Sequence, residues 1–207
     1  MTSEICISVW ERKVSEIQQE QVLKLDKVRD AWLPAVEFLF GPAYEKAQFL
    51  GFEVSSDIAQ PEFIFPNTSQ PFDYKVIMPA RTFTNEVMLL ADIMQVLVRG
   101  LYPKQSEDEK YTALSEGVAV YGAVTAIKQV FGEETLDSYL NALKDNGFAY
   151  YDAFSYVAVL LTEDPKAIVK LREIKPLLYQ IKREDFSAVG IVIDRKIADI
   201  LTYTFRA

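Results

Sequence analysis

The spacing of hydrophobic residues changes twice along the chain, and these changes constrain the fold more than any other feature. From about residue 15 to residue 40, hydrophobic side chains recur every three or four positions, which is the period of an amphipathic helix. Residues 47–78 instead hold short runs of aromatic and β-branched residues separated by prolines. The helical period returns after residue 84. This order predicts an α+β fold, with a small antiparallel sheet in the N-terminal half and a mainly helical C-terminal half.

Glycine, proline and capping residues set the predicted ends of these elements. Gly41-Pro42 should end the first helical region, and Pro34 should divide it into two helices. Strands are expected at 49–54, 63–65 and 74–78, and a terminal strand at 4–10, where hydrophobic residues alternate. The remaining helices are expected at 84–101 with Thr84 as N-cap, 109–131, 134–146, 148–162, from Asp164-Pro165 onward, and at 186–205.

The length of 207 residues suits a single domain that spans residues 1–207. Within it we expect a helix-and-sheet lobe over residues 1–83 and a helical lobe over residues 84–207. Hydrophobic residues make up 50% of the chain and charged residues 25%, which is the composition of an ordered globular protein.

The chain contains no histidine and a single cysteine, Cys6, and this excludes several kinds of active site. The usual zinc sites need histidine and cysteine ligands, and a Ser-His-Asp triad needs a histidine base. Ser115, Ser155 and Ser187 therefore have no such base. The sequence also lacks a Walker loop and a GxGxxG motif. We expect no bound metal and no cofactor.

The charge balance and the hydropathy exclude two classes of partner. Lys and Arg number 22 against 30 for Asp and Glu, so the formal charge is −8, which is the wrong sign for a nucleic-acid partner. No window reaches the roughly 18 apolar residues of a membrane span, and the first residues do not resemble a signal peptide. A lone cysteine cannot form an intrachain disulfide, so a cytoplasmic location is expected.

Two short segments of the helical half carry the residues that indicate a function. The first is Ala91-Asp92-Ile93-Met94-Gln95, and the second is Ser115-Glu116-Gly117-x-Ala119-x-Tyr121, in which Glu116 follows Gln95 by 21 residues. Together with the preceding strands, they resemble the gluzincin metallopeptidases, the thermolysin- and aminopeptidase-like group with an HExxH helix and a downstream Glu ligand. The resemblance covers the order of elements over roughly residues 30–160 and implies a zincin-like core.

The departures from that pattern imply that catalysis is lost. Ala91 and Gln95 stand where the family has its two histidine ligands; alanine has no donor atom, and an amide oxygen is a poor zinc ligand. Asp92 stands at the position of the general base, one methylene shorter than Glu. Of the three positions that carry zinc ligands in the resembled family, only Glu116 has a side chain of the matching type. Without zinc there is no activated water, so the resemblance implies an inactive pseudo-peptidase.

A retained cleft would then bind a peptide, a partner chain or a small ligand without cleaving it. The candidate cleft residues are Asp92, Gln95, Glu116, Tyr150 and Tyr151. A carboxylate left without its cation needs a partner, so we expect Glu116 to be buried and hydrogen-bonded to Gln95 or to Tyr150, Tyr151 or Tyr156. In the resembled families the cleft lies beside the edge strand, which places an added peptide strand along 74–78.

Two alternative functions remain open from the sequence. Asp92 and Glu116 form a possible acid/base pair of a hydrolase, or oxygen ligands, with Gln95, for Mg²⁺ or Ca²⁺. In the second alternative, the chain is an unrelated helical interaction or structural module. Gly117 then lets two helices approach closely, and the aromatic residues of 148–156 belong to the core.

Overall fold

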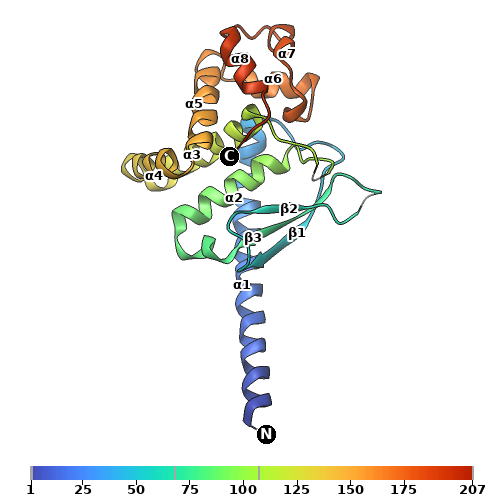
Figure 1. Ribbon diagram of the computed structural model, residues 1–207, viewed down its shortest axis with the longest axis vertical. Coiled ribbons are helices and arrows are strands. Elements are labelled where there is room, and N and C mark those ends of the chain that lie inside the picture. Colours follow the sequence, from blue (N-terminus) through green and yellow to red (C-terminus); the bar gives the residue numbers. More distant parts are fainter. Residues whose placement is uncertain (1, 68, 107, 207) are drawn as a thin grey trace.

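The computed structural model describes residues 2–67, 69–106 and 108–206, with side chains described from Glu16 onward. A long helix is followed by a small sheet and then by a series of helices (Figure 1). The elements are α1 (Thr2–Phe40), β1 (Gln48–Ser55), β2 (Glu62–Ile64), β3 (Asp73–Pro79), the 3₁₀ turn η1 (Ala80–Thr84), α2 (Glu86–Gly100), α3 (Ala113–Phe131), α4 (Glu133–Asn146), α5 (Phe148–Glu163), α6 (Ala167–Ile174), the 3₁₀ turn η2 (Leu178–Gln180), α7 (Arg183–Ala188) and α8 (Arg195–Thr202). The predicted α+β class is confirmed.

The first helix is continuous, so two predictions about it are wrong. Residues 4–10 lie inside α1 rather than in a strand, because a helix makes its backbone hydrogen bonds within the segment whereas a strand needs a partner. Pro34 is also inside α1 and does not divide it. Its missing N–H costs one hydrogen bond near the helix end, while Val36 and Phe40 beyond it are buried in the core. Gly41 ends the helix as predicted, with φ 87°.

The sheet has the predicted strands but not the predicted orientation. Its order is β1-β3-β2, with β1 parallel to β3 and β2 antiparallel to β3, so the sheet is mixed rather than antiparallel. The short β2 returns the chain so that β3 can run in the direction of β1. The predicted peptide-adding segment 74–78 therefore lies in the central strand. Both of its edges are occupied, which makes that prediction wrong and leaves β1 and β2 as the edges.

The helix starts and stops follow the capping residues, with two differences. Asn85, not Thr84, caps α2, because its Oδ1 accepts a hydrogen bond from the Val87 N–H at 2.8 Å, while the Thr84 hydroxyl donates to the Arg81 carbonyl at 2.7 Å. Thr112 caps α3, so that helix begins after residue 109. Gly132 and Gly147 follow the last residues of α3 and α4, as predicted.

The C-terminal region is more broken than predicted. The Asp164 carboxylate caps a turn by accepting from the Lys166 N–H at 2.9 Å, and α6 starts only at Ala167. The single helix expected at 186–205 is wrong: α7 and α8 are separate, and Gly190 lies between them with φ 75°. That backbone conformation is one that glycine adopts without strain, and it ends the first helix.

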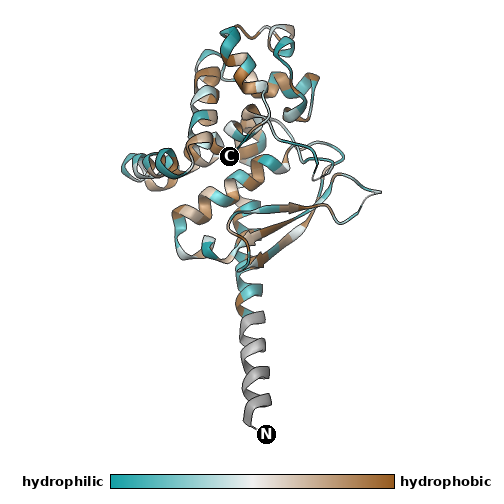
Figure 2. Cartoon of the chain, in the orientation of Figure 1, coloured by the Kyte–Doolittle hydropathy of each residue, from teal (hydrophilic) through white to brown (hydrophobic). Residues whose placement is uncertain are grey.

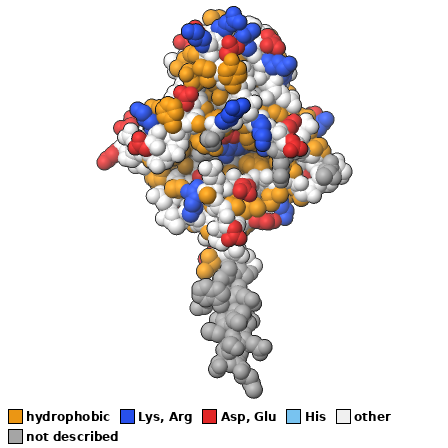
Figure 3. All heavy atoms as spheres, in the orientation of Figure 1, with side chains coloured by type: hydrophobic (Ala, Val, Ile, Leu, Met, Phe, Trp, Pro, Cys, Tyr) orange, Lys and Arg blue, Asp and Glu red, His pale blue; other side chains and the backbone are white. Residues whose placement is uncertain are grey.

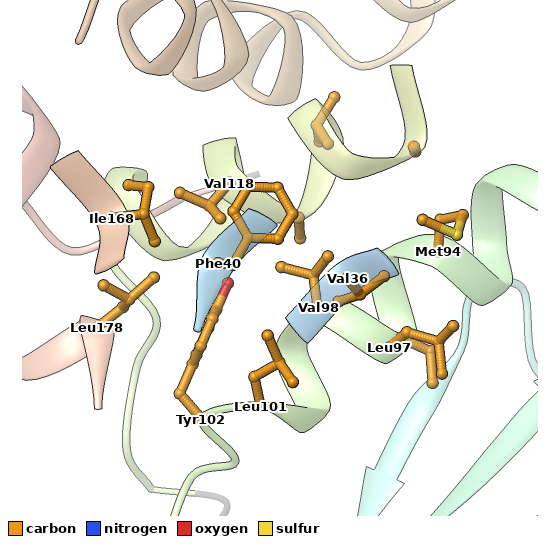
Figure 4. Packing of buried hydrophobic residues seen from close by; sticks show 14 of the residues in the cluster. Val36, Phe40, Met94, Leu97, Val98, Leu101, Tyr102, Val118, Ile168 and Leu178 are labelled. Carbon is orange, nitrogen blue, oxygen red and sulfur yellow. The ribbon is translucent and has the colours of Figure 1, made fainter. Parts of the chain in front are cut away.

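One hydrophobic cluster extends from Leu25 in α1 to Leu201 in α8 and includes the sheet. Figure 4 shows Phe40 of α1 between Val98 of α2 and Val118 of α3, with Tyr102 below it. Many residues of α2 and α3 are hydrophobic, whereas α4 is more hydrophilic (Figure 2). Among the described residues, no helix combines the length and hydropathy that crossing a membrane requires.

Candidate functional site

A groove of about 640 Å³ lies between α2 and α4. Acidic and basic side chains are interspersed over the face seen in Figure 3, so charge alone does not mark a binding region there. The groove is instead distinguished by its shape and its lining residues. The α2 wall of the groove carries Met88, Ala91, Asp92, Gln95 and Arg99. The α4 wall carries Thr135, Ser138, Tyr139, Ala142, Leu143 and Asn146. Both sets are spaced by three or four residues and so lie along one face of each helix.

The ends of the groove come from other parts of the chain. Gln60 and Pro61, directly before the edge strand β2, lie at the groove together with Arg81 of η1. Tyr150 of α5 also lines it. The opposite face of α2 is buried against the core through Ile93, Leu97 and other hydrophobic residues. Packing of that face fixes the rotation of α2 and therefore turns the Ala91–Arg99 stripe toward the groove.

Arg99, which lines the groove, forms a buried ion pair with Glu116. The Arg99 guanidinium donates to both Glu116 carboxylate oxygens, at 2.6 and 3.2 Å, and to Gln95 Oε1 at 3.2 Å. The side chains are 11% and 5% exposed, respectively. Burial lowers the pKa of Arg99, but the Glu116 charge and hydrogen bonds outweigh this effect and hold it above its usual range. The pair is charge-assisted and bidentate, which is the strongest geometry for such a contact.

Glu116 is buried, as expected, but its partner is Arg99 rather than Gln95 or a tyrosine. Arg99 lines the groove and Glu116 does not, so the guanidinium lies between the carboxylate and the groove. Gln95 joins the same network from the other side, as a second acceptor for Arg99. Sequence reasoning missed Arg99, although a signal was present. It lies four residues after Gln95 and eight after Ala91, on the same side of the helix as both.

Asp92 lines the groove in quite different surroundings. Its Oδ2 accepts a hydrogen bond from the buried Thr82 hydroxyl at 2.5 Å, the one hydrogen bond that the described residues make to this carboxylate. Burial raises the pKa of Asp92, and this outweighs the opposing effects of the Thr82 hydrogen bond and of the Arg81 and Arg99 charges. Asp92 is thus the partly buried carboxylate on the α2 wall of the groove.

Some of the candidate tyrosines line the groove, and the others pack against neighbouring side chains away from it. Tyr150 lines the groove and packs against Phe205, with ring centroids 4.7 Å apart. Tyr151 does not line it and instead packs near Phe154 at 6.3 Å, with the Lys144 ammonium 5.9 Å from its ring. Tyr156 packs against the core. The tyrosine that sequence reasoning missed is Tyr139 of α4. Burial raises its pKa to about 12, and hydrogen bonding with Gln95 opposes that shift.

Gly117 has a structural role that the sequence allowed for. A Cβ at this position would lie 2.4 Å from the Ala153 carbonyl oxygen and 2.7 Å from a Val157 methyl group. Only glycine permits so close an approach of α3 to α5. The glycine that follows Glu116 is therefore required for helix packing, whatever the role of its neighbour.

The donor set limits what the groove can do chemically. Among the side chains of residues 16–67, 69–106 and 108–206, no group of three Asp or Glu residues is placed to hold a metal ion together. Asp92 lines the groove and Glu116 does not, because Glu116 is paired with Arg99. The arrangement provides one accessible carboxylate, a neutral Arg99–Glu116 pair and apolar walls that include Met88 and Leu143. Such a site suits binding of a ligand with both apolar and hydrogen-bonding groups.

Comparison with known proteins adds no relative. No protein-family model matches the sequence, and neither a curated protein nor a solved structure is found to be similar to it.

Proposed function

We propose that this chain is a metallopeptidase-like protein without peptidase activity, and that it binds a peptide in the groove between α2 and α4. The observation that carries the proposal is the position of Arg99. Its guanidinium meets Glu116 with two hydrogen bonds and supplies the positive charge that a metal ion would otherwise bring to such a carboxylate. A buried, charged carboxylate without a cation would be strongly unfavourable. Arg99 supplies that cation, so Glu116 needs no metal ion.

The arrangement of the elements supports the likeness to the gluzincins. Ala91, Asp92 and Gln95 lie on the face of α2 that lines the groove, and Glu116 follows on the next helix. The groove also reaches Gln60 and Pro61, which lead into the edge strand β2. A cleft between the edge strand and the active helix is what the resemblance implies. An extended peptide would thus lie along α2, with its backbone near the start of β2.

The same contacts weigh against the hydrolase alternative. An acid/base pair needs two carboxyl groups that both reach the scissile bond. Asp92 reaches the groove, but Glu116 lies behind Arg99 with both oxygens engaged. A hard-cation site built on Asp92 and Glu116 meets the same obstacle, because a cation would have to displace the guanidinium.

Binding of fluorescein-labelled random octapeptides, measured by fluorescence polarisation, tests the proposal. We expect a subset of these peptides to bind and to remain intact by mass spectrometry. Ala142→Trp places a large side chain on the groove-facing side of α4 and should weaken binding about tenfold or more. Asn141→Trp is the matched control, because Asn141 is exposed on α4 outside the groove lining and its replacement should change affinity little.

Two results would contradict the proposal. Peptide binding that Ala142→Trp leaves unchanged would place the binding site elsewhere. Cleavage of bound peptides by the purified chain, abolished by Asp92→Asn, would show an active hydrolase instead.

A further inference from the structure

Asp92 is an unusual carboxylate within this groove. It is partly buried, it faces apolar side chains as well as polar ones, and it takes part in no ion pair with a described residue. Oδ2 is held by Thr82, and Oδ1 has no hydrogen bond from any described group. A charged group placed in a partly dry site without a counter-ion is costly for the fold.

The two arginines whose charges act on Asp92, Arg81 and Arg99, are engaged with other acceptors. The Arg81 Nε donates to the Ala59 carbonyl at 2.6 Å, and the side chain is exposed to solvent. Arg99 is neutralised by Glu116 and also donates to Gln95. The nearby cations therefore lower the energy of the Asp92 anion through space but do not pair with it. Neither arginine forms a hydrogen bond with Oδ1, so a further cation bound at that oxygen would replace no hydrogen bond of theirs.

The opposite wall of the groove supplies further oxygen acceptors. Tyr139 of α4 lies close enough to Asp92 that the negative charge contributes to the raised pKa of the phenol. Ser138 of the same helix also lines the groove. An alkylammonium group has three N–H donors and no acceptor, which matches a carboxylate in a groove that also presents hydroxyl oxygens. Its carbon chain matches the apolar surface of Met88 and Leu143.

We propose that Asp92 is the recognition residue for an ammonium group of the bound peptide, supplied either by a lysine side chain or by the free N-terminus. This inference rests on the proposed peptide-binding function and gives it a substrate class. Asp92 then has a binding role, at the position where the resembled family has a catalytic base. The carboxylate forms a charge-assisted hydrogen bond with the ligand, and Thr82 holds it in position from the other side.

The experiment compares short peptides by isothermal titration calorimetry against the full chain. The first is a pentaalanine with a central lysine and both ends blocked, the second replaces that lysine with norleucine, and the third is a pentaalanine amide with a free N-terminus. We expect at least one ammonium peptide to bind about tenfold or more tightly than the norleucine peptide. The lysine and free-amine peptides separate the two sources of the ammonium group.

Asp92→Asn keeps an oxygen that can accept from Thr82 but removes the charge. It should abolish the preference for ammonium peptides, so that the variant binds the lysine and norleucine peptides with similar affinity. Asp145→Asn makes the same charge change at an exposed position on α4 outside the groove lining, so the preference should persist.

The pH dependence gives a second readout. Asp92 is faced by Arg81, Arg99 and Tyr139, and the Tyr139 phenol, with a pKa of about 12, stays neutral through the acidic range. The preference for ammonium peptides should therefore fall as pH drops and Asp92 takes up a proton.

Each failure has a distinct meaning. Equal binding of the lysine, norleucine and free-amine peptides would overturn the ammonium inference and leave peptide binding in place. A preference that survives Asp92→Asn would also overturn it. Absence of binding by every one of these peptides, together with no binding of the random octapeptides, would overturn both proposals.

Discussion

Asp92 and Glu116 are carboxylates of neighbouring helices, and their immediate contacts separate their roles. Glu116 receives two hydrogen bonds from one guanidinium and is 5% exposed, which suits a fixed structural charge. Asp92 has a hydroxyl group as its hydrogen-bonding partner and lines the groove. Keeping Asp92 charged therefore lowers the stability of the folded chain, which is common for residues that serve binding rather than stability.

The Asp92 carboxylate gives a stability prediction with a definite sign. Burial raises its pKa in the folded chain above the ordinary value of 3.8, so the folded state binds the proton more tightly than the unfolded state. Its contribution to the free energy of unfolding therefore falls as pH rises through the interval between these two pKa values. Asp92→Asn removes this penalty. The variant should gain stability over the wild type as pH increases from about 3.8 toward neutrality.

Urea denaturation at a series of pH values measures this difference, with Asp145→Asn as the control. A constant difference between Asp92→Asn and the wild type across the series would contradict the prediction. A gain for Asp92→Asn at acidic pH that disappears at neutral pH would contradict its sign.

At the level of elements, local patterns predicted the existence of most helices and strands but not their long-range arrangement. Gly41, Gly132 and Gly147 end helices because their effect is local. The direction of β1 relative to β3 and the continuity of α1 through Pro34 depend on packing that no short pattern contains. The same limit applied to the site. The Ala91–Gln95 face was predictable from helix periodicity, but the Arg99–Glu116 contact joins two helices and needed their relative rotation.

That contact modifies what a zinc site engineered on the gluzincin pattern would require. Ala91→His, Asp92→Glu and Gln95→His together introduce the two missing nitrogen ligands, but Arg99 still engages the remaining carboxylate. We expect the triple variant to bind zinc weakly. Adding Arg99→Gln frees Glu116. If α2 and α3 are arranged as the proposed likeness implies, Glu116 then joins the two histidines as a third ligand and should tighten zinc binding about tenfold or more.

Thermal unfolding with and without zinc measures this effect, because a ligand bound to the folded state raises the melting temperature. Arg99→Gln alone is the control and should be destabilised without any response to zinc. A folded quadruple variant that shows no zinc-dependent stabilisation would count against the likeness of α2 and α3 to the gluzincin helices.

At the scale of the whole molecule, Arg172 of α6 joins parts of the chain that are distant in sequence. Its guanidinium donates to the carbonyls of Phe40, Gly41, Pro42 and Leu101, at 2.6, 2.8, 2.5 and 3.0 Å. Phe40 is the last residue of α1, Gly41 and Pro42 follow it, and Leu101 is the C-cap of α2, so these carbonyls lie where helical hydrogen bonding ends. Arg172 thereby ties the last helices to the region that carries the sheet.

Arg172→Met keeps much of the side-chain volume but removes every donor. It should lower the free energy of unfolding by about 3 kcal/mol, since several buried carbonyls lose a charged partner. Urea denaturation gives the value. Arg183→Met is the comparison, because Arg183 forms a surface ion pair with Asp199 and its loss should cost less than about 1 kcal/mol. Equal effects of the two substitutions would contradict the role assigned to Arg172.

The cation beside Glu116 is covalently attached to the chain. A metal ion at such a position exchanges with the solution, and its occupancy varies with pH, with competing chelators and with supply. The guanidinium of Arg99 neither dissociates nor deprotonates under ordinary conditions. The Arg99–Glu116 pair therefore keeps the same charge and shape in a metal-poor or chelating solution as in a metal-rich one.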